Sequence, residues 1–147
     1  MMYPFNVRVY GLLFSADGEI LLTDEERHGT RFTKFPGGGL IYGEGLIEGL
    51  KREFVEECNV EIEVLEHFYT TDFFIKSAFD ESQVICVYYH VSPKTELLIN
   101  FKHHLFDFGD QEVLQSFRWK KIADLHQEDV TFPGDKKVVE LLKSKGC

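Results

Sequence analysis

Runs of β-forming residues recur along this chain, and only two segments have the apolar spacing of a helix. Strands are predicted at 5–14, 19–23, 31–35, 60–76, 83–91 and 114–120, and helices at 44–58 and 136–143. Turn residues at 15–18 predict a hairpin between the first two strands. The order of strands, one helix, more strands and a last helix predicts an α+β fold in which helices sandwich a mixed sheet.

The size of the chain suits a single domain. At 147 residues and 44% hydrophobic content, it has enough apolar surface for a core of its own. Its three cysteines, Cys58, Cys86 and Cys147, have irregular spacing that indicates neither a disulfide framework nor a zinc site, and Cys58 and Cys86 are expected to be small buried residues. No signal peptide is apparent, and no apolar run approaches the ~20 residues that span a bilayer. We therefore expect a cytoplasmic protein without a membrane partner.

The charge balance excludes one large class of partner. A net charge of −9 and a pI near 5.1 argue against binding DNA or RNA, which requires a basic face. An anionic small molecule stays compatible, since divalent metal ions can invert the local field. Four basic residues lie in or near the early strands and are interpreted first as surface charges and second as phosphate contacts: Arg8, Arg27, Arg31 and Lys34.

Three acids crowd one edge of the first predicted helix. At 100° per residue, Glu53, Glu56 and Glu57 fall within about 100° of one another. They lie beside the predicted core side of that helix, which consists of Leu46, Ile47, Leu50, Phe54 and Cys58. Like charges at these spacings destabilise a helix by roughly 0.2–0.5 kcal/mol per pair. They also lie toward the negative end of the helix dipole.

Such a conflict with local preferences is typical of a functional site. A hard divalent cation would relieve it, because Mg²⁺ is held by carboxylates and substrate phosphate oxygens. The alternative is that these are solvated surface glutamates, partly relieved by Arg52, which lies four residues from both Glu48 and Glu56. Pro36 and three glycines precede the helix, and glycines allow the backbone to approach a ligand closely.

The segment from Gly38 to Val60 resembles the Nudix box, the signature of the Nudix hydrolases. The matching residues are Gly38, Glu44, Arg52-Glu53, Phe54, Glu56-Glu57 and Val60. One position departs from the box, since Asn59 stands where the family has glycine. That glycine follows the helix, where a left-handed residue is wanted, and asparagine is the usual second choice.

The resemblance implies the Nudix fold, an α/β/α sandwich with a central mixed β-sheet flanked by helices, formed by one domain over 1–147. It implies hydrolysis of a diphosphate in a small nucleotide-type substrate with Mg²⁺ or Mn²⁺, and it leaves a homodimer open. Carried over residue by residue, the metal ligands are Glu53, Glu57, Glu56 and the Gly37 carbonyl, with Glu56 also a candidate base. Arg52 would orient the carboxylates and Glu44 would support the loop and helix. The substrate-side candidates are Gly38, Glu44, Arg31 and Phe35. Arg31 and Phe35 come from the residues themselves: the default for Arg31 is a surface charge, and Phe35 could stack on a base, with core packing as its default.

The general base is less defined by the resemblance, since many relatives use an acid from a late loop. Here that loop supplies Glu112, which we favour, then Asp110 and Asp107; the alternative for each is a solvated loop acid. ADP-ribose-cleaving relatives often carry a proline about 15 residues beyond the box, where this chain has Ile75. A nucleoside triphosphate, a nucleotide sugar and a dinucleotide all stay open.

Two other functions are known on the same fold. A catalytically silent Nudix-like ligand sensor is the main alternative, but such modules commonly lose the box glutamates that this chain keeps. A diphosphate isomerase on the same fold needs an active-site cysteine and metal-binding histidines, whereas Cys58 is expected on the apolar side of the helix.

Overall fold

The computed structural model describes residues 4–144, so Cys147 lies outside the described residues. The chain divides into two compact units. The first contains the chain up to Leu12 together with Gly37–Leu97, and the second contains Leu13–Pro36 and the chain from Leu98 onward. The whole predicted Nudix box therefore belongs to the first unit.

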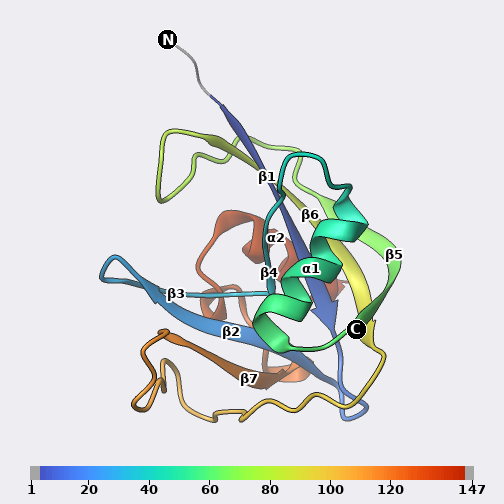
Figure 1. Ribbon diagram of the computed structural model, residues 1–147, viewed down its shortest axis with the longest axis vertical. Helices are drawn as coiled ribbons and strands as arrows, with labels where there is room; N and C mark the ends of the chain where they lie inside the picture. Colours follow the sequence, from blue (N-terminus) through green and yellow to red (C-terminus); the bar gives the residue numbers. More distant parts are fainter. Residues whose placement is uncertain (1–3, 145–147) are drawn as a thin grey trace. The chain divides into compact units, whose positions relative to one another are not determined.

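The first unit is built on a four-stranded sheet with the strand order β4-β1-β6-β5. Its strands are β1 (Phe5–Leu13), β4 (Gly37–Gly39), β5 (Ile62–Thr70) and β6 (Gln83–Pro93). The pairs β1–β4 and β5–β6 are antiparallel. Helix α1 (Leu46–Cys58) lies across this sheet (Figure 1). The contact is close, because a Cβ added to Gly11 of β1 would lie 2.6 Å from the ring of Phe54.

Helix α1 begins two residues later than predicted, after the N-cap Gly45. Its buried residues are Gly49, Leu50, Phe54 and Cys58. Ile47, which the apolar spacing placed on the core side, is instead 45% exposed. It stands in the first turn, and the spacing of apolar residues around a helix does not show how far along the axis other elements cover it.

The end of α1 confirms the interpretation of Asn59. This residue has φ 51° and ψ 41°, in the left-handed region, and its N–H donates to the Val55 carbonyl at 3.1 Å. Asparagine therefore closes the helix in the conformation for which glycine is usually chosen.

The second unit is built on a three-stranded antiparallel sheet with the strand order β3-β2-β7. Its strands are β2 (Glu19–Arg27), β3 (Thr30–Lys34) and β7 (Gln115–Lys121). A two-residue turn joins β2 to β3, with His28 and Gly29 both at positive φ. Two short 3₁₀ helices, η1 (Ile122–Asp124) and η2 (Gln127–Asp129), precede helix α2 (Pro133–Ser144).

Two local predictions are corrected. The hairpin between the first two strands is present only at its turn, where Phe14 and Ile20 form an antiparallel bridge and the Ser15 N–H donates to the Glu19 carbonyl at 2.8 Å. Beyond the turn, β1 and β2 pair in different sheets. The turn signal between them was right, but burial decides which strands pair. Helix α2 starts at Pro133, three residues before the predicted start at 136, so Asp135 is a buried residue of its first turn. Proline suits that first position because its missing N–H would have no partner there.

Charged side chains are buried inside the second unit. Arg118 donates to Asp24 at 2.6 Å and Thr33 donates to the same carboxylate at 2.6 Å, with Asp24 fully buried. Lys34, interpreted above as a surface charge, has a side chain only 3% exposed and lies 3.0 Å from Glu25. Buried charges require such partners, because desolvation makes an isolated ion costly.

The predictions on the burial of the two cysteines and on membrane-spanning helices concern the apolar part of the sequence. Cys58 and Cys86 are buried, as expected. Within residues 4–144, no helix has both the length and the apolar content needed to cross a membrane.

Candidate active site

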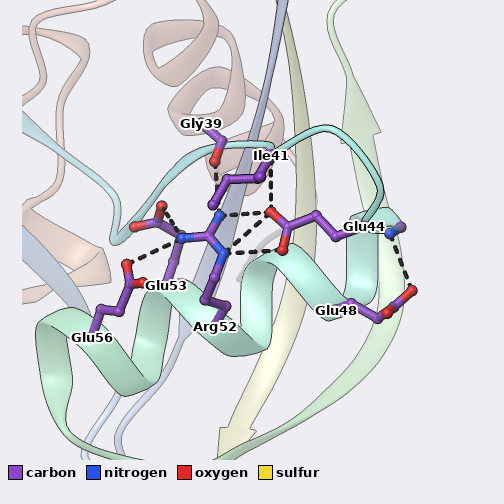
Figure 2. Close-up of polar contacts among 8 residues, drawn as sticks. Gly39, Ile41, Glu44, Glu48, Arg52, Glu53 and Glu56 are labelled. Carbon is purple, nitrogen blue, oxygen red and sulfur yellow. Dashed lines mark hydrogen bonds and ion pairs between the residues drawn. The ribbon is translucent and has the colours of Figure 1, made fainter.

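Arg52 lies at the centre of the predicted site and joins the box glutamates (Figure 2). Its guanidinium donates to Glu44 from Nη2 at 2.6 Å and from Nε at 3.0 Å. Nη1 donates both to Glu53 at 3.0 Å and to Glu56 at 3.1 Å. Nη2 also donates to the carbonyl of Gly39 at 3.0 Å. One side chain thus ties the helix, the preceding loop and β4 together.

The loop before α1 is held by the same carboxylate. Glu44 accepts a hydrogen bond from the N–H of Ile41 at 2.8 Å as well as those from Arg52. The Arg52 hydrogen bonds, followed by the Ile41 N–H, lower the pKa of Glu44. In turn, the hydrogen bond to Glu44 and then those to Glu53 raise the pKa of Arg52, although burial acts the other way. Both partners are therefore charged at neutral pH.

The glycines of β4 leave room for the Glu53 carboxylate. A Cβ on Gly38 would lie 2.7 Å from the Glu53 carboxyl atoms, closer than side-chain carbons are found. Gly37 has φ 145°, and a Cβ there would lie 2.1 Å from the carbonyl oxygen of Val9. Glycine at these two positions lets strand and acid approach, so Glu53 is 11% exposed beside the main chain of the loop.

The acids are arranged around Arg52 rather than around a metal site. Residues 4–144 contain no group of three or more His, Cys, Asp or Glu side chains placed to hold a metal ion. The donor chemistry nevertheless suits Mg²⁺, since Glu53 and Glu56 already converge on one nitrogen and carboxylate oxygens are its preferred protein ligands. Glu56 is 57% exposed, and an exposed ion pair of this kind costs little to exchange. Arg52 contacts only one oxygen of Glu53 and one of Glu56, so the second oxygen of each carboxylate fits a hard divalent cation while Arg52 holds the first.

Five of the predicted site residues are therefore brought together directly: Gly38, Glu44, Arg52, Glu53 and Glu56. Glu57 is half-buried one turn after Glu53, and Gly37 is buried at the start of β4. The spacing of the box predicted this grouping, because the helix repeat sets the acids on one edge.

The remaining candidates belong to the second unit. Arg31 is exposed, pairs with Glu26 at 2.9 Å, and its guanidinium lies over the Phe106 ring at 5.3 Å. Phe35 is completely buried and contributes to the core. Glu112 is exposed. The core position of Phe35 leaves no exposed surface for a substrate contact, while the roles assigned to Arg31 and Glu112 stay predictions.

One residue of interest in the first unit, Arg8, was interpreted above as a surface charge. It lies on β1, is half-buried, and donates from Nε to the Tyr10 hydroxyl at 2.6 Å. The signal that could have singled it out is its place among apolar neighbours in a strand that the pattern predicted to be largely buried.

A family model for the NUDIX domain matches residues 4–142, and the match spans parts of both units. Comparison of the sequence with curated proteins gives no match.

Several solved structures are similar to this protein over nearly the whole chain. The ORF135 protein of E. coli is 20% identical with a TM-score of 0.68, covering 97% of this chain and 91% of its own. A NUDIX hydrolase from Nitrosomonas europaea is 19% identical with a TM-score of 0.70, covering 97% and 90%. The MutT protein of Methanosarcina mazei Go1 is 18% identical with a TM-score of 0.69, covering 99% and 98%.

At such identities these likenesses concern the fold, and they confirm the predicted class, a mixed sheet flanked by two helices. The family match extends over the box whose acids and arginine the structure brings together. The chain belongs to the NUDIX domain family and is an enzyme of the Nudix pyrophosphohydrolase type.

Proposed function

We propose that this enzyme hydrolyses a phosphoanhydride bond in a nucleoside triphosphate or a nucleoside diphosphate-linked metabolite, with Mg²⁺ or Mn²⁺ as cofactor. The observation that carries the proposal is the convergence of Glu44, Glu53 and Glu56 on Arg52, beside Gly37 and Gly38, where an added Cβ would lie too close to its neighbours. Carboxylates beside a glycine strand can bind a divalent cation and still leave space for the diphosphate oxygens that the same cation must bind.

The proposal assigns a role to each residue of the box. Glu53, Glu57 and the Gly37 carbonyl would hold the cation, with Glu56 as a further ligand or as the base that takes a proton from the attacking water. When bound, a divalent cation neutralises charge on the diphosphate oxygens and lowers the pKa of water. Arg52 keeps the Glu53 and Glu56 side chains in register while Glu44 anchors Arg52 to the loop.

The substrate-side assignments are part of the same proposal. Arg31 is proposed to contact the substrate beyond the diphosphate, whereas Phe35 is assigned to the core in which it is completely buried. Glu112 is the favoured loop base, ahead of Asp110 and Asp107. Alanine substitution of the three loop acids separates these possibilities. If all three variants keep wild-type activity, the loop has no part in the reaction and Glu56 becomes the base.

The test of the hydrolysis itself is a substrate panel. Nucleoside triphosphates, nucleotide sugars and dinucleotides are incubated with Mg²⁺ or Mn²⁺, and release of phosphate or nucleoside monophosphate is measured with and without EDTA. We expect release from at least one class and its loss in EDTA. If no compound is cleaved, the chain is a silent ligand sensor and the proposal is wrong.

The box acids are tested by one substitution and one matched control. Glu53→Gln should remove most turnover, because the amide is a poor ligand for a divalent cation, while the unfolding temperature stays near that of the wild type. Glu48→Gln is the control on the same helix. Glu48 accepts a hydrogen bond from the Gly45 N–H, and the amide oxygen of glutamine can accept the same hydrogen bond. Near-normal activity in Glu53→Gln would exclude Glu53 as a ligand.

A further inference from the structure

The guanidinium of Arg8 is held in place by one hydrogen bond from Nε, which leaves its Nη1 and Nη2 groups as potential donors. Its Nε donates to the hydroxyl of Tyr10 at 2.6 Å, and its Cζ lies 5.8 Å from the centre of the same ring. Tyr10 is itself fixed, because its ring stacks on Tyr88 at 5.3 Å. Among the described residues 4–144, the Nη1 and Nη2 groups of Arg8 form no hydrogen bond or ion pair. Half-buried and charged, these donors call for an acceptor.

The acceptor is expected next to the box, because of where β1 places Arg8. Arg8 pairs with Gly39 and Val9 pairs with Gly38 across the β1–β4 ladder. Successive residues of a strand face opposite sides, so Arg8 and the Glu53 carboxylate lie on either side of the same short edge strand. A Cβ on Gly39 would lie 3.5 Å from Nη1 of Arg8, so no side chain separates this guanidinium from the edge.

The charges around Arg8 agree with this placement. Burial by itself lowers the pKa of Arg8, but Tyr10 and, more weakly, Cys86 and Glu53 outweigh it, so the pKa is raised. Arg8 is therefore charged at neutral pH, and Glu53 is close enough for the two charges to interact.

We propose that Arg8 binds a phosphoryl group of the substrate through Nη1 and Nη2, beside the diphosphate held at the box; this rests on the proposed hydrolysis. Two parallel N–H donors of a guanidinium match two oxygens of a phosphoryl group, a geometry that lysine cannot reproduce. The bond from Nε to Tyr10 pre-orients this fork, so little side-chain freedom is lost when the anion binds. Arg8 is a residue that determines affinity for the phosphorylated part of the substrate.

Binding in the absence of metal isolates this contact. Calorimetry in EDTA compares nucleoside 5′-monophosphates with the corresponding nucleosides, for the wild type, Arg8→Gln, Arg8→Lys and Lys76→Gln. Lys76 is an exposed lysine of the same unit, paired with Glu81, and its substitution matches the change in net charge. The wild type should prefer the monophosphate by about 10- to 100-fold, the range of a charged hydrogen-bond pair.

Arg8→Gln should abolish the preference for the monophosphate, Arg8→Lys should keep part of it, and Lys76→Gln should keep all of it. In Mg²⁺, Arg8→Gln should raise KM more than it lowers kcat. An unchanged preference in Arg8→Gln overturns the assignment. So does a loss of affinity that is equal for nucleoside and monophosphate, because that outcome indicates a structural role with Tyr10.

The two proposals fail in different ways. If the wild type cleaves nothing in the panel but shows an Arg8-dependent preference for monophosphates, the hydrolysis is wrong and the Arg8 site stands. If cleavage is metal-dependent and Arg8→Gln has wild-type kinetics and binding, the hydrolysis stands and the Arg8 site is wrong.

Discussion

Arg52 balances the charges of the box helix in the structure, and it does so by geometry as much as by charge. Its planar fork donates to Glu44, Glu53, Glu56 and the Gly39 carbonyl at the same time. A lysine at this position could neutralise these acids, but its single ammonium group could not donate to all four acceptors in fixed directions. The orientation of the acids therefore depends on the guanidinium.

Arg52→Lys tests this dependence. Activity on the substrate found in the panel should fall about 10- to 100-fold, since one or more charge-assisted hydrogen bonds are lost. The unfolding temperature should change little, because the side chain is partly exposed and the charge is kept. Lys51→Arg, at an exposed neighbouring position, is the control and should be active. A fully active Arg52→Lys would show that charge alone suffices.

Alanine substitutions at Gly38 and Gly37, in the same strand, should have different effects, the first on activity and the second on stability. In Gly38→Ala the new Cβ meets the end of the Glu53 side chain, which can move, so activity should fall while the fold is kept. In Gly37→Ala the Cβ meets the backbone of Val9, which cannot move, so the protein should lose more than ~2 kcal/mol of stability. Kinetics and urea unfolding measure the two effects. Equal stability losses in both variants would contradict this division.

At the scale of elements, the β3-β2-β7 sheet is joined by ions as well as by backbone hydrogen bonds. Asp24 on β2 accepts from Arg118 on β7 and from Thr33 on β3, so one buried carboxylate links all three strands. Such a pair adds little over a well-packed apolar pair, but removing one partner leaves a buried charge unpaired.

Asp24→Asn should therefore destabilise the protein by about 3–5 kcal/mol, because Arg118 stays buried without a counter-charge. Thermal unfolding measures the loss. Glu26→Gln, on the same strand but in an exposed pair with Arg31, should cost less than ~1 kcal/mol. The double variant Asp24→Leu with Arg118→Met should recover much of the stability; if it does not, the pair contributes more than its burial explains.

At the scale of the whole molecule, stability should depend on pH through a buried acid. Burial by itself raises the pKa of Glu25, but Lys34, the Thr23 hydroxyl and Arg27 outweigh it, so the pKa is lowered. Folded Glu25 then binds protons less readily than it does in the unfolded chain. Its contribution is complete above the ordinary value of 4.5 and is lost as the pH falls through the lowered folded value.

Urea unfolding between pH 7 and pH 3 measures this dependence. The wild type should lose stability below pH 4.5, and Glu25→Gln should be less stable at pH 7 with a shallower loss on acidification. The slope should not vanish, because hydrogen bonds to Glu44 and Asp80 lower their pKa values too. Glu63→Gln, at an exposed position, should follow the wild-type curve. An identical slope in Glu25→Gln would exclude Glu25 as a contributor.

The sequence by itself determined the fold class, the box and the helix that carries it. Those features are local: a period of 3.6 residues sets Glu53, Glu56 and Glu57 on one edge, and the left-handed conformation after the helix selects Asn59. Spacing along the chain is enough to recognise such patterns, since neighbours in sequence are neighbours in space.

Only the tertiary structure decided which groups meet across the chain. The first two strands pair in different sheets, Lys34 is buried, and Arg8 lies beside Gly39. These three features could not be predicted locally, because burial and strand pairing depend on distant partners. The partners of Arg52 also depend on tertiary structure. Arg52 donates to Glu44 and Gly39, and not to Glu48, because the loop before α1 folds back onto the helix. Long-range packing, which no local period encodes, placed these charges.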